Sequence, residues 1–230
     1  YFNTEIQSIK KDLDLTFSND DLLFDLEVSI GILTQEGIDI TYPHRSLQEY
    51  FAALFVTKLT YENKLKVYHY LYNQFNNMLN HRYVQSDNVN FYSLLGEMDK
   101  ISFYKRLIIP ILESIKQKVS ELNNTEDIID TFIAVREVSF LFDKEMSTEF
   151  FDEYKRYNQT FEQYLEKLRK NRRKKKKNES EVFSEARNML ANNDILPFLK
   201  DYNYDKIIFK IEAEIRKSEN IDSELNSENY

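Results

Sequence analysis

Glycine and proline are rare in this chain, which carries three of each among its 230 residues. Sandwiches, barrels and Rossmann-type sheets need frequent turns, and turns depend on these two residue types. Beyond residue 60, by contrast, apolar residues recur at helical spacing in one segment after another. The sequence therefore predicts a mainly α fold, and a chain of this length suffices for one large domain or two small ones.

Residues 1–60 differ from the rest because they carry a β-hairpin signal. Short runs of β-branched and aromatic residues at 32–34 and 38–42 flank Gly37, which can take the positive φ of a tight turn. Two short helices are expected before this hairpin and one longer helix after it. The order helix, helix, hairpin, helix is the outline of a winged-helix unit.

We predict three parts in the chain. Residues 1–60 form the winged-helix unit, and residues 61–217 form an all-α helical domain. Residues 218–230 are polar and acidic, so we expect them to form a disordered tail. Because the chain begins with Tyr1 rather than a methionine, we also expect it to be a piece of a longer polypeptide.

A strand-to-helix turn after the hairpin is the most informative local feature. Pro43 cannot donate to a β-ladder, so the second strand should end there. Ser46 and Glu49 have the spacing of a capping box, in which each side chain bonds a backbone N–H at the helix start. His44 and Arg45 would then lie just ahead of a helix N-terminus, where backbone N–H groups favour an anion.

Composition and motifs exclude several classes of site. The net charge of -8 repels nucleic acid and anionic membranes on average, and the absence of cysteine excludes disulfides and thiolate chemistry. No apolar run reaches the ~18 residues of a membrane span. The sequence has no glycine-rich phosphate loop, serine-nucleophile motif or histidine zinc motif, so we predict no catalytic residues and no metal site.

One strongly basic segment covers residues 169–177. It could bind nucleic acid, anionic lipid or an acidic partner, or it could be the solvated end of a helix, where cations favour the helix dipole. No aromatic residues interleave with it for base stacking. The helix before the hairpin carries four acidic residues between Asp20 and Glu27 and no lysine or arginine, which disfavours DNA reading by the winged helix.

The stretch from Tyr42 to Ala53, YPHRSLQEYFAA, closely resembles the motif F-x-H-x-[ST]-F-Q-E-[FY]-x-A-A at the end of the NACHT module in STAND-class NTPases. Tyr42 and Leu47 replace the two usual aromatic residues. The upstream segment SIGIL at 29–33 is similar to the S-G-[IL]-L that opens the wing of the winged helix in the same proteins. They include animal NOD-like receptors and many bacterial anti-phage proteins, and the resemblance covers roughly residues 9–60.

The resemblance implies a role for the motif histidine. In that family the winged helix packs over the nucleotide pocket in the resting state, and the histidine contacts the ADP phosphate. His44 would make this nucleotide-phosphate contact here, while the other motif positions support its structure, namely Ser46, Gln48, Glu49, Tyr50 and Phe51. The phosphate loop and the Mg²⁺-binding acid lie upstream in the family. ADP or ATP would therefore bind through an upstream NTPase domain, and this chain would not be an enzyme by itself.

The function that the resemblance implies is regulatory. The chain would be the winged-helix and C-terminal helical region of a cytoplasmic NACHT signalling ATPase, which gates nucleotide-dependent activation and senses or binds a protein trigger in antiviral defence. Its partners would be the upstream NACHT domain, the trigger and, on activation, further copies of itself, with no membrane, while nucleic acid is disfavoured. Two alternatives stay open: a helical interaction scaffold with a structural winged helix, and a winged-helix nucleic-acid-binding protein.

Overall fold

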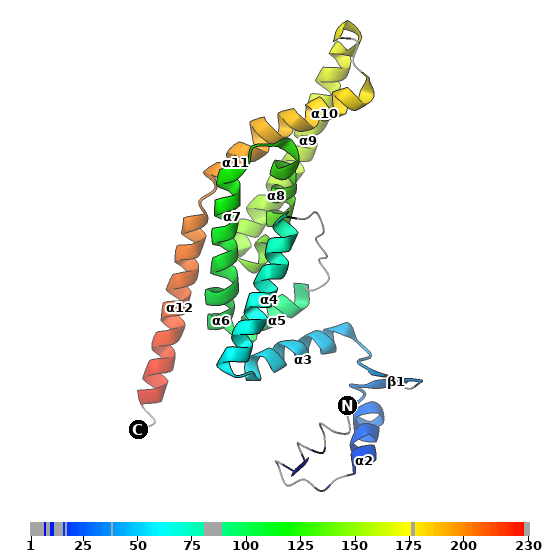
Figure 1. Ribbon diagram of the computed structural model, residues 1–230, viewed down its shortest axis with the longest axis vertical. Coiled ribbons are helices and arrows are strands. Elements are labelled where there is room, and N and C mark those ends of the chain that lie inside the picture. Colours follow the sequence, from blue (N-terminus) through cyan, green and yellow to red (C-terminus); the bar gives the residue numbers. More distant parts are fainter. Residues whose placement is uncertain are drawn as a thin grey trace.

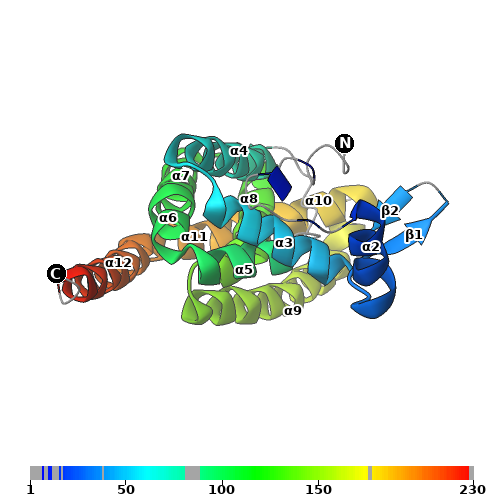
Figure 2. The ribbon, with the colours of Figure 1, turned by 90° about the horizontal axis from the view of Figure 1, so that it is seen from below.

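The computed structural model describes residues 7, 10, 11, 16, 18–37, 39–80, 89–175 and 178–227. The described chain is an elongated helical bundle with a small N-terminal unit attached at one end (Figure 1). Helix α3 lies across that end of the bundle and carries the unit, as the view from below also shows (Figure 2). The first expected helix, over residues 3–13, lies almost entirely outside the described residues.

The N-terminal unit joins two short helical segments, a hairpin and a longer helix. These are α2 (Asn19–Phe24), the π-helical turn η1 (Asp25–Ser29), strands β1 (Thr34–Glu36) and β2 (Asp39–Thr41), and α3 (Arg45–Lys58). The strands pair antiparallel with Thr34 opposite Thr41, and Gly37 takes a φ of 69° at the turn. The predicted hairpin and its glycine turn are therefore confirmed, although the strands are shorter than expected.

Helix α2 is capped by Ser18, one of the three residues, with Asn19 and Asp20, that the sequence offers as its N-cap. The Ser18 hydroxyl accepts hydrogen bonds from the backbone N–H groups of Asp20, at 3.1 Å, and Asp21, at 3.3 Å. Both acidic side chains lie in the first turn, where negative charge complements the helix dipole. These local interactions favour the helix although it buries none of its own residues.

The bundle begins at Tyr61 and consists of helices throughout its described part. Its elements are α4 (Tyr61–Asn80), α5 (Val89–Met98), α6 (Lys100–Phe103), η3 (Tyr104–Ile108), α7 (Ile109–Glu121), α8 (Thr125–Val138), η4 (Ser139–Leu141), α9 (Lys144–Lys175), α10 (Glu179–Leu190), η5 (Ala191–Ile195), α11 (Leu196–Asp201) and α12 (Tyr204–Ser227). Together with the small sheet, this confirms the predicted mainly α fold with one hairpin.

Pro110 and Pro197 lie inside continuous helical segments, each two residues after a π-helical turn. In the first of these turns, η3, the Ile109 N–H bonds the carbonyl of Tyr104, five residues back. A proline lacks an N–H and crowds the carbonyl one turn earlier in a regular helix, and the wider π-helical turn accommodates both defects. Residues 100–121 therefore stay helical through Pro110, a residue type that can break a regular helix.

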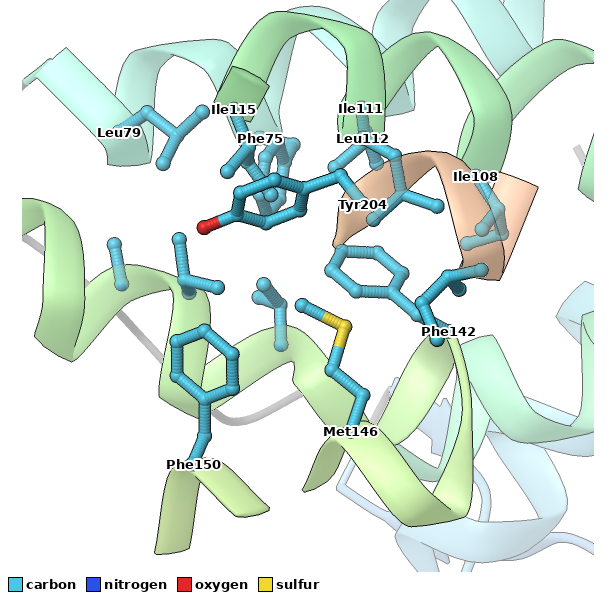
Figure 3. Close-up of a cluster of buried hydrophobic side chains, with 14 of the residues drawn as sticks. Phe75, Leu79, Ile108, Ile111, Leu112, Ile115, Phe142, Met146, Phe150 and Tyr204 are labelled. Carbon is cyan, nitrogen blue, oxygen red and sulfur yellow. The ribbon is translucent and has the colours of Figure 1, made fainter. Parts of the chain in front are cut away.

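The core of the bundle is an apolar cluster to which most of its helices contribute. Phe75 of α4 and Leu112 of α7 meet Met146 and Phe150 of α9 there, and Tyr204 enters it from the start of α12 (Figure 3). Aromatic rings extend the cluster toward α8 and α11, since the Phe132 and Phe150 rings stack with centroids 5.7 Å apart and Phe198 meets Phe150 at 5.0 Å. This core holds α12 against the bundle.

Helix α12 continues to Ser227, so it covers most of the segment expected as a disordered tail at 218–230. Two features carry the helix past residue 217. Apolar residues at helical spacing anchor it as far as Ile215, and the Lys105 ammonium pairs with the carboxylate of Glu219. The composition argument missed this because a polar segment can continue a helix that is already nucleated by packing. Residues 228–230 lie outside the described part.

Candidate functional site

The candidate site is the turn between β2 and α3. Strand β2 ends at Thr41, just before Pro43, as the proline predicts. His44 is the N-cap residue of α3, with extended backbone angles of φ -130° and ψ 130°, and its carbonyl accepts from the Leu47 N–H at 3.0 Å. The histidine therefore stands directly at the N-terminus of a helix of 14 residues.

The predicted capping box at Ser46 and Glu49 is wrong. The helix begins at Arg45, so Ser46 is its second residue and cannot be the N-cap. No side-chain cap bond is formed at this helix start. The backbone is still extended at His44, and the chain turns into the helix immediately afterwards, earlier than the serine signal suggests.

Glu49 instead links the motif to the bundle. Its Oε1 atom accepts from Arg45 Nε at 3.0 Å, and its Oε2 atom accepts from Asn90 Nδ2 of α5 at 2.8 Å. The Glu49 side chain is 13% exposed, so both bonds are partly shielded from water. The Arg45 contact has the i,i+4 spacing of a helical ion pair and was visible in the sequence. Asn90 lies 41 residues away in the sequence, and no local sequence pattern predicts its contact with Glu49.

Two aromatic contacts brace the other side of the turn. The Tyr42 ring stacks on the Phe51 ring with centroids 5.6 Å apart, and Tyr50 meets Phe51 edge-on at 5.4 Å. Further along α3, Ala53 and Val56 are buried where the helix packs along α5. The small Ala53 side chain permits this close approach. The contacts of Tyr42, Glu49 and Phe51 thus hold the start of α3 against its surroundings.

The remaining polar groups of the motif are exposed. His44, Ser46 and Gln48 are all exposed, and the described part of the chain forms no hydrogen bond or ion pair with their side chains. Large apolar side chains of the same unit are exposed as well, with Phe24 at 59% and Phe55 at 65%. Exposed groups of both kinds on one small unit are typical of a surface that another domain covers.

Other candidate chemistry is limited in the described residues. They contain no group of three or more histidine, cysteine, aspartate or glutamate side chains able to hold a metal ion. None of their helices is long and apolar enough to cross a membrane. At the start of the basic segment, Arg169 pairs with Glu179 at 2.7 Å and Lys170 with Glu166 at 2.7 Å. Nothing is described for the side chains of residues 171–177.

A comparison with known protein families gives one match. The family model of the short NACHT-associated C-terminal domain, family 9, matches residues 98–229, which is more than half of the chain. The chain belongs to this family. No curated protein and no solved structure matches it.

The family match confirms the expected relation to NACHT proteins through a separate part of the chain. The motif resemblance covers residues 9–60, whereas the family match begins at Met98, the last residue of α5. The two segments do not overlap, and α5, which packs along α3, leads into the matched segment. The NACHT-associated C-terminal domain thus begins at the end of the helix that contacts the motif.

Proposed function

We propose that this chain is the regulatory C-terminal region of a NACHT protein. Residues 1–60 are its winged-helix switch, and the helical region after them senses a protein trigger in antiviral defence. The family match supports the association with a NACHT protein. The order α2, η1, hairpin and α3 supports the winged-helix interpretation of the N-terminal unit.

The upstream NACHT domain is the proposed partner of the exposed side chains of this unit. The polar ones include His44, Ser46 and Gln48, and the apolar ones include Phe24, Val28, Ile30 and Phe55. A domain packed on these side chains would remove the apolar ones from water, at about 25 cal/mol for each Å² buried. It would also supply partners for the polar groups of the motif.

Nucleotide is proposed to complete that interface. His44 stands at the N-terminus of α3, where the first backbone N–H groups and the helix dipole favour a phosphate. An imidazole N–H can donate to a phosphate oxygen of ADP held by the upstream domain. The hydrolytic groups belong to that domain in this proposal, so the chain contributes a contact to the nucleotide and no catalytic residue.

The bond between Glu49 and Asn90 is the observation that carries the proposal. It joins the turn that holds His44 to α5, and α5 leads directly into the NACHT-associated domain. A trigger that displaces α5 would therefore disturb the turn. Conversely, release of nucleotide would loosen the turn and weaken its bond to α5 through Asn90. A two-state switch requires such reciprocal coupling. In the proposed switch, ADP favours a closed form, and the open form assembles with further copies in the cytoplasm.

The test is the amount of ADP that the full-length NACHT protein retains through purification, measured by chromatography of the nucleotide released on denaturation. We expect His44→Ala to lower the retained ADP about tenfold, which corresponds to a loss of about 1.4 kcal/mol, the size of one charge-assisted hydrogen bond. The matched control is His69→Ala, because His69 is an exposed histidine on α4 away from the turn. Full retention of ADP by His44→Ala would overturn the proposal.

A further inference from the structure

A cavity of about 520 Å³ lies in the NACHT-associated domain, away from the motif turn. Its walls come from α9, η5, α11 and the first turn of α12, and its opening faces solvent. The motif-based function does not use this cavity. All of its lining residues fall between Glu145 and Ile207, within the segment that the family match covers.

Aromatic rings form one wall of the cavity. Phe198 and Tyr202 are half-buried, with ring centroids 5.7 Å apart, and both rest on the buried ring of Phe150, at 5.0 and 5.1 Å. Packing on this core fixes the orientation of both rings. The faces of such rings attract cations, and the attraction strengthens where water is partly excluded.

The cations around the cavity are already paired. Arg156 donates through Nε to Glu153 Oε2 at 2.9 Å and lies over the Tyr157 ring. Lys206 lies 3.6 Å from the carboxylate of Glu145. Each positive charge of the lining is therefore balanced by one of these acidic partners. The other carboxylates of the lining have no cation of the lining left to pair with.

Three carboxylates of the lining have no cationic partner among the described residues, namely Glu149, Asp194 and Asp201. Asp194 accepts a hydrogen bond from the Tyr164 hydroxyl at 2.9 Å, which holds its side chain in place. Glu149 lies close to Tyr202, and burial together with this carboxylate raises the pKa of the Tyr202 hydroxyl. The cavity therefore combines uncompensated negative charge with an aromatic wall.

The π-helical turn η5 places Asp194 at the cavity. The Leu196 N–H bonds the Ala191 carbonyl five residues back, which widens the helix just before Pro197. Turns of this kind occur frequently at functional sites. Here the turn brings Asp194 and Asn193 to the cavity lining, with Asp194 bonded to Tyr164 of α9.

We propose that this cavity binds an arginine or lysine side chain of a protein partner, through cation–π contact with Phe198 and Tyr202 and charge pairing with Glu149, Asp194 and Asp201. The site rests on the proposed function, because it would be where the sensor domain recognises its trigger. A basic side chain supplies the positive charge that the lining lacks, and its apolar stem suits the aromatic wall. An acidic or phosphorylated partner would meet the wrong charge.

The test uses the whole chain and two small probes, N-acetyl-arginine amide and its uncharged analogue N-acetyl-citrulline amide, followed by backbone NMR shifts. We expect saturable shifts for the arginine probe in residues that line the cavity, with roughly fivefold weaker binding of the citrulline probe, as loss of a cation–π and charge contact implies. The double variant Glu149→Gln and Asp201→Asn should weaken binding of the arginine probe to a similar extent.

Glu212→Gln is the matched control, because Glu212 is an exposed acid on α12 outside the cavity. It should leave the arginine affinity unchanged. Equal binding of the two probes, or an unchanged affinity in the double variant, would overturn the inference. Because neither probe involves ADP, failure here is distinct from failure of the His44 test, which concerns the motif turn alone.

Discussion

Two buried tyrosine hydroxyls of the bundle differ in their surroundings. Tyr68 donates to Asp99 Oδ2 at 3.0 Å, and the same carboxylate oxygen lies 3.1 Å from the Lys64 ammonium. Burial and the nearby Asp99 carboxylate raise the pKa of Tyr68, so its hydroxyl stays protonated and remains a donor. The Tyr204 hydroxyl is buried in the apolar cluster of Figure 3 and has no hydrogen-bond partner in the described structure.

This difference predicts opposite effects of the same substitution. Tyr204→Phe removes an unsatisfied buried hydroxyl and should raise the free energy of unfolding by about 1 kcal/mol. Tyr68→Phe removes a satisfied hydroxyl and should lower it by about 1 kcal/mol. Urea denaturation of the three proteins measures both changes. A destabilised Tyr204→Phe variant would show that the hydroxyl has a partner in solution.

At the scale of elements, the contact between α3 and α5 predicts a measurable coupling. Glu49→Ala and Asn90→Ala each break the bond between these helices, so the double variant should be more stable than the sum of the single effects implies, by about 1 kcal/mol. A double-mutant cycle by urea denaturation measures this energy. Gln48→Ala with Asn90→Ala is the control cycle and should be additive. Additivity in the Glu49 cycle would show that the bond does not couple the two helices.

Much of the element structure could be predicted because the deciding interactions are local. Gly37 sets the hairpin turn, Pro43 ends the strand, and Ser18 caps α2. The prediction failed at Ser46, because the helix begins one residue earlier, at Arg45, with His44 as its N-cap. A cap depends on which residue first leaves the extended conformation, and the motif spacing does not decide this.

The candidate site was only partly accessible to prediction. His44 could be singled out because its position before an amphipathic helix is visible in the sequence. The contact of Glu49 with Asn90 could not be predicted, because it depends on how α5 packs against α3. The same holds for the cavity, whose walls come from α9 and α12 and meet only in the folded bundle.

At the scale of the whole molecule, charged contacts tie α12 to the start of α9. Lys210 Nζ lies 2.7 Å from Glu145 Oε2 and 3.3 Å from Asp143 Oδ2. Lys210, with Lys206 nearby, lowers the pKa of Glu145 below its ordinary 4.5, and Glu145 in turn raises the pKa of Lys210 above its ordinary 10.5. Between pH 4.5 and 10.5 both charged groups contribute to the stability of the fold. The contribution of Glu145 is lost as the pH falls through its lowered pKa.

This network predicts an acid-dependent difference between variants. Lys210→Met should lower the melting temperature at pH 7, and the gap to the wild-type protein should shrink as the pH falls below about 4.5. Lys217→Met is the control, because Lys217 is an exposed lysine on α12 outside the network. Thermal unfolding followed by circular dichroism across this pH range provides the measurement. A gap that is constant with pH would show that Lys210 acts through packing alone.

The central claim is that the turn holding His44 responds to nucleotide and passes this response to α5. Hydrogen–deuterium exchange of the full-length NACHT protein, with ADP and without nucleotide, tests it most directly. The account predicts slower exchange with ADP in residues 42–58 and in α5, and loss of this difference in His44→Ala. Unchanged exchange in both segments, while the upstream domain itself becomes protected by ADP, would contradict it.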